Sequence, residues 1–242
     1  MSFEDALEWK AALAISEVSR QLARSVPAPR GTPYFGLDVG EAYDLHALDA
    51  LSTRGIFRKY EFALDLGAGL GGRTRWLAAR LGCRAIGLEA RPAAVAAAAL
   101  LNRRAHVDDH VGFQTGALDC LPLRERVFTH VWMLDAPPAA CTAVHLAEAF
   151  RVLRRGGYFV LQCPALSAED EAILLDRLRA TGFFELESHA IAVADPPHIW
   201  RLAQARLRTA LDTAPDVLAA WADRNAPPSN ARRLQIFGRR PA

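Results

Sequence analysis

The sequence predicts an α/β protein built on a doubly wound, mostly parallel sheet of seven strands. From residue 61 onward, short apolar runs alternate with segments whose apolar residues recur at helical spacing. A glycine-rich turn, residues 67–72, follows the first apolar run, as at the start of many nucleotide-binding sheets. Because a helix between two strands brings the chain back to the same end of the sheet, this alternation favours parallel pairing.

Local signals support each expected element. The first strand is a short apolar run that ends in glycine, and the helix at 91–107 is rich in alanine with Pro92 in its first turn. The helix at 167–182 opens with a capping signature formed by Ser167 and Asp170. In order, the expected strands are 61–67, 84–90, 111–117, 127–136, 158–165, 183–194 and 232–240, and the helices among the first six are 72–82, 91–107, 141–157 and 167–182.

The chain is expected to divide into a helical N-terminal arm and a sheet domain. Residues 1–58 hold two helical segments, 4–25 and 40–55, joined by a linker rich in proline and glycine, and residues 59–242 form the sheet domain. Residues 195–230 interrupt the alternation with a helical insertion before the last strand. Because such an insertion usually covers the ligand edge of the sheet, we expect a lid or a wall of the acceptor pocket.

Composition favours a cytoplasmic protein with no nucleic-acid or membrane partner. The 29 basic and 27 acidic residues give a formal net charge of +2, which offers no electrostatic footprint for either. The N-terminus is charged, unlike a signal peptide, and no apolar run reaches the ~20 residues of a membrane span. The four cysteines form no C-x-x-C pair, which favours reduced structural thiols over a metal site. The amphipathic segment at 4–25 suits a homodimer interface as well as it suits cover for its own sheet.

The stretch LDLGAGLGG, residues 64–72, fits two glycine-rich signatures that imply different cofactors. Gly67, Gly69 and Gly72 have the spacing of a dinucleotide turn, whereas Asp65 with Gly67, Gly69 and Gly71 has that of a turn for S-adenosylmethionine. A carboxylate at Asp65 would be unfavourable beside a pyrophosphate and favourable beside a sulfonium and an ammonium group. Its charge therefore favours the methyl donor, although a structural Asp65 bonded to the turn is compatible with the same sequence.

Five segments in order carry a family resemblance. ALDLGAGLGG, IGLEA, TGALDCLPL, VFTHVWMLDA and AEAFRVLRRGGYFVLQ resemble the class I S-adenosylmethionine-dependent methyltransferases, over about residues 60–165. The likeness is greatest to the small-molecule branch that includes the sarcosine/dimethylglycine and tocopherol methyltransferases. The resemblance implies a Rossmann-like fold, S-adenosylmethionine as cofactor and a small-molecule methyl acceptor.

The resemblance also implies roles for individual residues. Asp65 would organise the amino-acid end of the cofactor, and Glu89 would hold the ribose hydroxyls. The backbone of Gly67, Ala68, Gly69 and Gly71 would contact the methionine and ribose part, and Ala90, Ala117 and Leu118 would lie at the adenine. Tyr34 would fold over the cofactor from the N-terminal linker, or serve there as a hydrophobic anchor.

Three positions depart from the family pattern. Ala117 stands where the family commonly has an acid that reads the adenine amino group, so adenine recognition is less well defined by the sequence than ribose recognition. Thr129 alters the usual start of the fourth strand, and Arg155 replaces the usual proline of R-V-L-(R/K)-P-G-G.

Two residues are candidates for a catalytic base. Asp135 ends the fourth strand at the expected ligand edge, where a helix N-cap explains it equally well. His198, in the insertion, would reach the acceptor from above, with Trp200 as an aromatic wall; packing of a lid helix explains the tryptophan equally well.

Three other functions compete with small-molecule methylation. A protein that binds S-adenosylmethionine or its product without transferring methyl is compatible with the altered positions. LDAPP resembles the D-A-P-C of RNA cytosine-5 methyltransferases, but Pro138 occupies the cysteine position and no basic tract accompanies it. A nicotinamide oxidoreductase would need a catalytic pair such as Y-x-x-x-K, which the sequence lacks.

Overall fold

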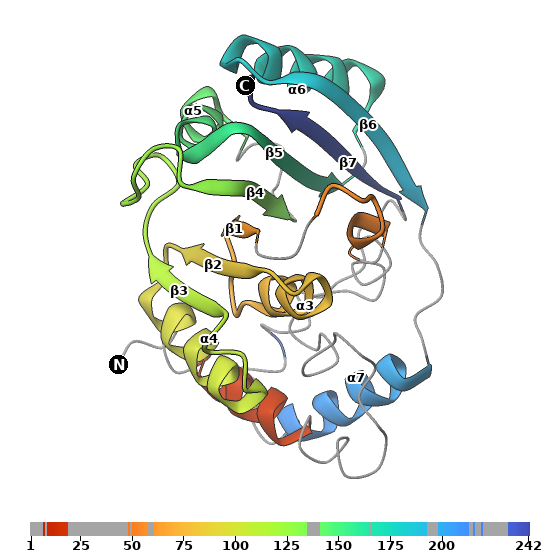
Figure 1. Ribbon diagram of the computed structural model, residues 1–242. Helices are drawn as coiled ribbons and strands as arrows, with labels where there is room; N and C mark the ends of the chain where they lie inside the picture. Colours follow the sequence, from red (N-terminus) through yellow and green to blue (C-terminus); the bar gives the residue numbers. More distant parts are fainter. Residues whose placement is uncertain are drawn as a thin grey trace.

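The computed structural model describes residues 7, 9–18, 48, 50–57, 61–134, 141–164, 166–192, 198–212, 215, 219 and 232–242. Its elements alternate along the chain as the sequence predicts (Figure 1). The strands are β1 Phe62–Leu66, β2 Arg84–Glu89, β3 Val111–Thr115, β4 Phe128–Leu134, β5 Leu153–Pro164, β6 Phe184–Ala192 and β7 Arg232–Arg239. The helices are α3 Gly72–Leu81, α4 Pro92–Ala105, α5 Ala143–Val152, α6 Ala168–Thr181 and α7 His198–Leu211.

One seven-stranded sheet has the order β3-β2-β1-β4-β5-β7-β6. The first five strands of that order pair in parallel, and β7 lies antiparallel between β5 and β6. The predicted Rossmann-like, doubly wound and mostly parallel sheet is therefore confirmed. The strand order reverses between β1 and β4, and in open α/β sheets ligands bind at the carboxyl ends of the strands beside such a reversal.

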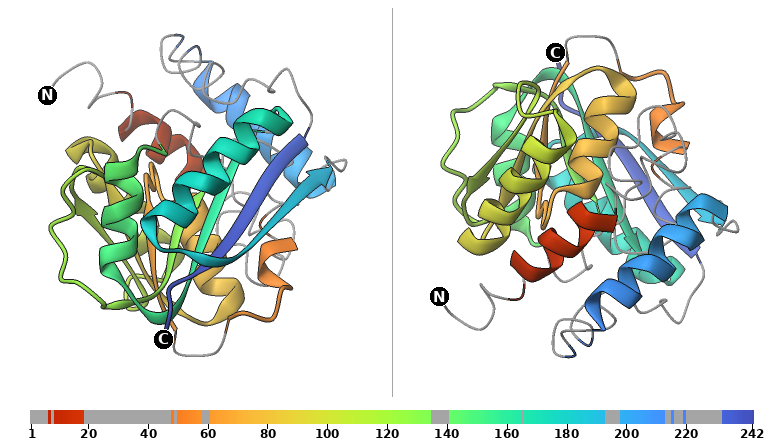
Figure 2. Two further views of the ribbon diagram at one scale, coloured as in Figure 1. Left: turned by 90° about the horizontal axis from the view of Figure 1, so that it is seen from above. Right: turned by 90° about the horizontal axis from the view of Figure 1, so that it is seen from below.

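Helices cover both faces of the sheet (Figure 2). Helices α5 and α6 lie on one face, where Leu64 and Val131 join Leu178 in the same buried cluster. Helix α3 lies on the other face, where Trp132 packs with Trp76. Because side chains alternate along a strand, β4 buries apolar residues in both layers, and all seven of its residues are buried.

The N-terminal helical residues pack against helices that lie far from them in the sequence. Ala12 and Ile15 share a buried cluster with Leu101 of α4 and with Leu207 of α7. Leu70, in the glycine-rich turn, packs against the same cluster. This cluster therefore connects the first described helix, α4, α7 and the loop that follows β1; Figure 2 shows the first described helix beside α4 and α7.

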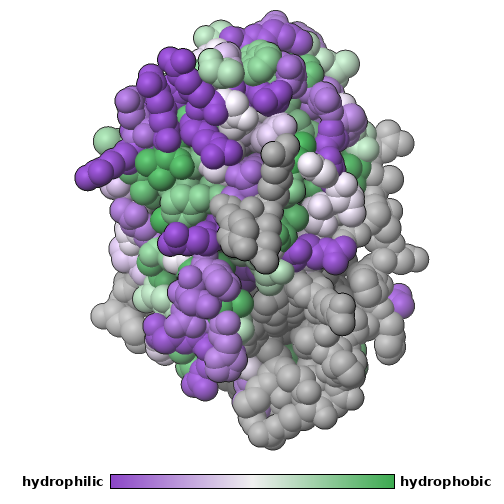
Figure 3. All heavy atoms as spheres, viewed as in Figure 1, coloured by the Kyte–Doolittle hydropathy of each residue, from purple (hydrophilic) through white to green (hydrophobic). Residues whose placement is uncertain are grey.

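The surface of the described residues has a mixed character. Hydrophilic residues cover most of the described surface that faces the viewer in Figure 3, with smaller hydrophobic areas among them. Large exposed apolar side chains are spread over separate helices, for example Leu13, Val144 and Ile173. In the part of the chain that the structure describes, no helix is both long and apolar enough to span a bilayer.

The junction between α5 and β5 differs from the prediction. The sequence predicts a helix to residue 157 and a strand from 158, but α5 ends at Val152 and β5 begins at Leu153. Leu153 has extended backbone angles, φ −73° and ψ 131°, and pairs with Phe128 of β4. The Arg240 guanidinium donates to the carbonyls of Phe150 and Leu153 at 2.6 and 2.8 Å, so it satisfies carbonyl groups that a helix end leaves open.

Gly71→Ala is expected to lower the free energy of unfolding by roughly 2–4 kcal/mol, because positive φ and a steric clash act together. Gly71 has φ +80°, and a Cβ there would lie 2.0 Å from Phe113 Cζ. Gly67→Ala is the matched control, since φ is +76° but no described atom lies within 4 Å of its Cβ position. Urea unfolding of both variants measures the difference. Equal losses would contradict the packing argument.

Candidate cofactor site

The loop after β1 is fastened to the end of β2. The N–H groups of Gly67 and Ala68 both donate to the Leu88 carbonyl, at 2.9 and 3.0 Å. Gly71 then precedes the first turn of α3, where no side chain caps the helix. Uncapped N–H groups at a helix start can bind an acceptor group on a ligand, so this turn is suited to hold one.

Two of the loop glycines border open space. Gly67 and Gly69 have φ values of +76° and +56°, and no described atom lies within 4 Å of the position of an added Cβ at either. Gly71 differs, because its Cβ position lies against Phe113. The first half of the loop can therefore approach a ligand closely, while the second half is packed inside the protein.

Glu89, the last residue of β2, is oriented by three hydrogen bonds. Gly69 N–H donates to Oε2 at 3.0 Å, and Arg91 donates to Oε1 from its backbone N–H and from Nε at 3.1 and 2.8 Å. Burial raises the pKa of Glu89, but the Arg91 side chain and the two backbone N–H groups outweigh it and leave the pKa below its ordinary value. A carboxylate has about four lone-pair sites, and three are used here, so this fixed anion has one site left, on Oε2, to accept from a hydroxyl group of a ligand.

Asp65 lies on β1, where it pairs with Gly87 of β2, and its environment differs from that of Glu89. Its side chain is almost fully buried on β1, and the Thr74 hydroxyl of α3 donates to Oδ2 at 2.5 Å. Burial raises its pKa to about 6, although the Thr74 hydrogen bond and the charge of Arg73 act in the opposite direction. Asp65 thus titrates close to neutrality, whereas Glu89 stays ionised.

The loop after β3 meets the same edge of the sheet. Gly116 N–H donates to the Glu89 carbonyl at 3.1 Å, so this loop is joined to β2 as well. Ala117 and Cys120 form an isolated antiparallel bridge that closes the turn between them. Ala90 and Ala117 are exposed, and Leu118 is half-buried against the core. The predicted residues of the first three strand ends therefore lie together.

Three predicted site residues, one for the cofactor and two for catalysis, are not placed at this edge of the sheet. Tyr34 and Asp135 lie outside the described residues, and His198 is placed only as the first residue of α7. Thr74 and Arg91, the partners of the two acids, were not predicted from the sequence. Thr74 follows Asp65 by nine positions across a turn, so its contact depends on how that turn folds.

The segment that contains these loops matches a known family. Residues 64–161 match the family described as a methyltransferase domain. Over this segment the chain is similar to the methyltransferase domain. The match falls within the residues, about 60–165, on which the sequence resemblance rests, and it agrees with that resemblance.

Two curated relatives align with less than half of the chain. Sarcosine/dimethylglycine N-methyltransferase of Halorhodospira halochloris is 33% identical over 110 residues, which are 45% of this chain and 39% of the relative. Sterol 24-C-methyltransferase of Saccharomyces cerevisiae is 28% identical over 115 residues, which are 46% of this chain and 29% of the relative. The matched regions thus span well under two thirds of either relative.

Solved structures share the fold over most of the chain. The cyclase SpnF superposes with a TM-score of 0.63 at 20% identity, over 81% of this chain and 80% of SpnF. Geranyl diphosphate C-methyltransferase of Streptomyces coelicolor A3(2) gives a TM-score of 0.56 at 15% identity, over 81% and 79% of the two chains. The shared fold therefore extends beyond the residues, 64–161, that match the family.

Asp65→Asn is expected to remove a pH dependence of stability. Because the native pKa of about 6 exceeds the ordinary value of 3.8, the native state holds this proton more tightly than the unfolded state does. The contribution of Asp65 to the free energy of unfolding therefore falls as pH rises from about 4 to about 6 and is constant above that range.

Urea unfolding at pH values from 4 to 8 compares the wild type with this variant. The stability of the wild type relative to Asp65→Asn should decrease through the lower half of the range and then level off. Asp176→Asn, at an exposed position of α6, controls for the loss of one negative charge. A wild-type advantage that grows with pH would contradict the assignment.

Proposed function

We propose that this protein is an S-adenosylmethionine-dependent methyltransferase that methylates an N, O or C atom of a small molecule by in-line displacement. The observation that carries the proposal is the Glu89 carboxylate, held by Gly69 N–H directly beside the glycine-rich loop of a methyltransferase domain. A ribose diol needs an anion fixed at this place. The curated relatives that share the domain are named for small acceptors, sarcosine and dimethylglycine in one and a sterol in the other.

The described residues fit S-adenosylmethionine better than a dinucleotide. Asp65 and Glu89 place two acidic groups at the loop, and Asp65 is mostly ionised at pH 7 because its pKa is about 6. Two negative charges there repel a pyrophosphate and attract a sulfonium and an ammonium group. Among the described residues, no atom fills the space beside Gly67 and Gly69, so a cofactor can approach the backbone there.

In this mechanism the chain aligns the reactants. S-adenosylmethionine, when bound, supplies an electrophilic methyl group on its sulfonium. Glu89 would hold the ribose by accepting from a hydroxyl group at its remaining site on Oε2, and the loop from Gly67 to Gly71 would hold the methionine and ribose part. Asp65 would attract the amino-acid end. Such alignment accounts for much of the rate in a displacement that needs no strong catalytic group.

Asp135 and His198 remain the proposed bases. In the sequence, Asp135 directly follows Leu134, the last residue of β4. Strands β1 and β4 mark the reversal of strand order, where ligands bind in open α/β sheets. A base beside the acceptor would remove its proton during or before attack. In the same proposal Tyr34 closes over the cofactor. The chain divides into an arm, residues 1–58, and a sheet domain, residues 59–242. Within the sheet domain, residues 195–230 act as a lid. We further propose a cytoplasmic protein whose arm is available for a homodimer.

A second function, cofactor binding without methyl transfer, is favoured by one observation. The cyclase SpnF has the same fold, so the fold alone does not specify methyl transfer. Two of the three altered positions do not favour it. The Thr129 hydroxyl accepts from Phe62 N–H at 2.9 Å, at the edge of the sheet opposite the glycine-rich loop. Arg155 is exposed in the early part of β5, also away from that loop. Of the three departures, Ala117 alone lies at the candidate cofactor site.

Calorimetric titration tests the proposal directly. The purified protein is freed of carried-over cofactor and titrated with S-adenosylmethionine, S-adenosylhomocysteine and NADH. We expect binding of the first two and none of NADH, followed by formation of S-adenosylhomocysteine in an acceptor screen. Binding of NADH alone would overturn the proposal, and binding without turnover across a broad screen would favour the second function.

Glu89→Ala is expected to weaken S-adenosylmethionine binding roughly tenfold to hundredfold, because it removes charge-assisted hydrogen bonds to the ribose. Glu169→Ala, at an exposed position of α6, is the control and should bind like the wild type. The same titration measures both variants. Unchanged affinity in Glu89→Ala would mean that the cofactor lies elsewhere.

Asp135→Ala is expected to lower turnover by about 10²- to 10⁴-fold, the usual contribution of a general base, with little change in cofactor affinity. Single-turnover kinetics at saturating cofactor separates the two effects. His198→Ala in parallel distinguishes the two candidate bases. Normal turnover in Asp135→Ala would assign that residue to structure.

A further inference from the structure

The loop between β3 and β4 has an exposed tip and a strongly held base. Ala117 and Cys120 form its bridge, and the tip that carries Ala117 and Asp119 is exposed. Leu118 packs against the core, and Gly116 N–H is bonded to the Glu89 carbonyl. The position of the exposed tip therefore depends on these contacts and on those of the residues that follow it, from Leu121 onward.

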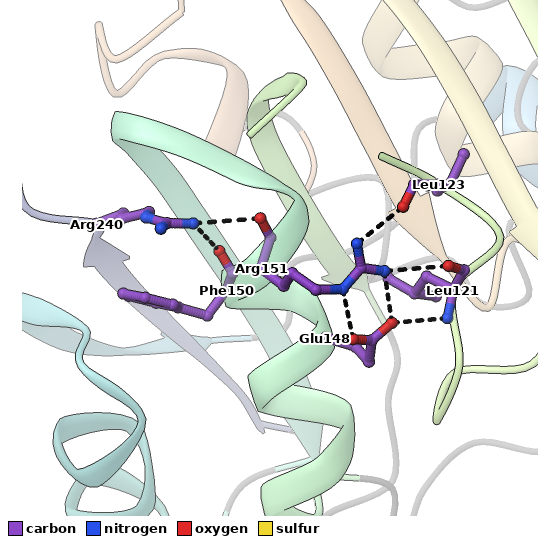
Figure 4. A network of polar contacts seen from close by, with 6 residues as sticks. All are labelled: Leu121, Leu123, Glu148, Phe150, Arg151 and Arg240. Carbon is purple, nitrogen blue, oxygen red and sulfur yellow. Dashed lines mark hydrogen bonds and ion pairs between the residues drawn. The ribbon is translucent and has the colours of Figure 1, made fainter. Parts of the chain in front are cut away.

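Glu148 and Arg151 of α5 hold that base (Figure 4). Arg151 Nε and Nη2 donate to the two carboxylate oxygens of Glu148 at 2.6 and 2.7 Å. Arg151 also donates to the carbonyls of Leu123 and Leu121 at 2.9 and 3.1 Å. Glu148 Oε2 in turn accepts from Leu121 N–H at 2.8 Å. The pair thus binds both the donor and the acceptor of Leu121.

The pair is more than an ordinary ion pair on a helix. Glu148 and Arg151 are 18% and 35% exposed, and their bonds reach a second segment of the chain. Asp176 and Arg179 of α6 have the same spacing. They are 75% and 59% exposed, and the ion pair between them stays within α6. An exposed pair of that kind contributes little, whereas a planar bidentate fork fixes the geometry of what it binds.

The Glu148–Arg151 pair, called the clamp from here on, is fixed in place by Arg240, and the loop is held at its other end by β2. Arg240 donates to the carbonyl of Arg151 at 3.2 Å and to that of Phe150 at 2.6 Å, which fixes the end of α5 (Figure 4). At the other end, Gly116 N–H donates to the Glu89 carbonyl, and a Cβ at Gly116 would lie 2.8 Å from Pro122 Cδ. The loop is therefore held at its start by Glu89 of β2 and at its end by Glu148 and Arg151 of α5.

Residue 117, in the loop that the clamp holds, is alanine, and this determines how the loop could recognise an adenine. Alanine has no polar side-chain atom, so at this position only the backbone of the loop can read the edge of an adenine. Adenine presents an amino donor and a ring-nitrogen acceptor on that edge, and hypoxanthine presents the reverse pattern. A backbone carbonyl and N–H can distinguish the two only if the loop holds them in place.

We propose that Glu148 and Arg151 are positioning residues that make the loop at 116–123 selective for the adenine of S-adenosylmethionine. The inference rests on the proposed function and names the part of the cofactor that this loop reads. Arg151 acts through the backbone of Leu121 and Leu123 rather than by touching the ligand. Because lysine cannot make the bidentate fork, Arg151→Lys keeps the charge and removes the geometry.

The experiment measures dissociation constants for S-adenosylhomocysteine and for its inosine analogue. We expect the wild type to prefer the adenine compound roughly tenfold or more. In Arg151→Lys, binding of the adenine compound should weaken about tenfold while that of the inosine compound changes little, so the ratio approaches one. In turnover, KM for S-adenosylmethionine should rise in this variant while kcat stays within about twofold.

Three further variants sharpen the test. Arg179→Lys is the matched control and should leave both constants unchanged. Glu148→Gln keeps an acceptor for Leu121 N–H but loses the charged pair, so its ratio should lie between those of the wild type and Arg151→Lys. Asp119→Ala should keep the wild-type ratio; loss of selectivity there would assign adenine reading to that side chain and overturn the proposal.

Other outcomes separate this inference from the proposed function. A wild type that binds neither compound overturns the proposed function and the inference with it. A wild type that binds and discriminates, with the same ratio in Arg151→Lys, overturns the inference alone. Equal weakening of both compounds in Arg151→Lys, with a lower melting temperature, also overturns it, because that result describes a general loss of structure.

Discussion

The carboxyl end of β2 is the constraint on which the candidate site depends. Its last two residues, Leu88 and Glu89, accept hydrogen bonds from three successive N–H groups of the loop after β1. The Glu89 carbonyl also accepts from Gly116, at the start of the loop after β3. Because β2 lies between β1 and β3 in the sheet, one strand end sets the position of both loops. The site is therefore as well defined as the parallel register of these three strands.

The two acids at this edge show how surroundings decide the properties of one functional group. Asp65 and Glu89 are both carboxylates, but burial dominates at Asp65 and raises its pKa, whereas Arg91 and backbone N–H groups lower that of Glu89. Glu89 thus offers a permanent negative charge for neutral hydroxyls. Asp65 carries a charge that a nearby cation would stabilise, so cofactor binding and the ionisation of Asp65 are expected to favour each other.

Much of the fold could be predicted from the sequence because local and global signals agree. Apolar runs, glycine turns and helix caps mark the same elements from β1 to α6, and parallel topology follows from their alternation. The end of α5 could not be predicted, since Leu153 suits a helix and its extended conformation depends on pairing with Phe128. The sequence holds no local sign of a partner 25 positions away.

The residues of the candidate site likewise fall into those that could be predicted from the sequence and those that could not. Gly67, Gly69 and Glu89 could be recognised because their spacing follows from the turn itself. Thr74, Arg91 and the pair on α5 could not, because each acts on a residue whose distance is fixed only by tertiary folding. Spacing alone would make Glu148 and Arg151 a helix pair like Asp176 and Arg179, and only the loop packed beside them distinguishes the two.

The antiparallel pairing of β6 with β7 allows the connection between them to vary independently of the rest of the sheet. Ala192, the last residue of β6, pairs with Arg232, the first of β7, so α7 lies in a long connection that leaves and returns at neighbouring points of the sheet. Lengthening such a connection costs little, because loop-closure entropy grows only slowly with length. Evolution could therefore remodel this segment, and any acceptor preference it carries, while the cofactor half of the sheet stays as it is.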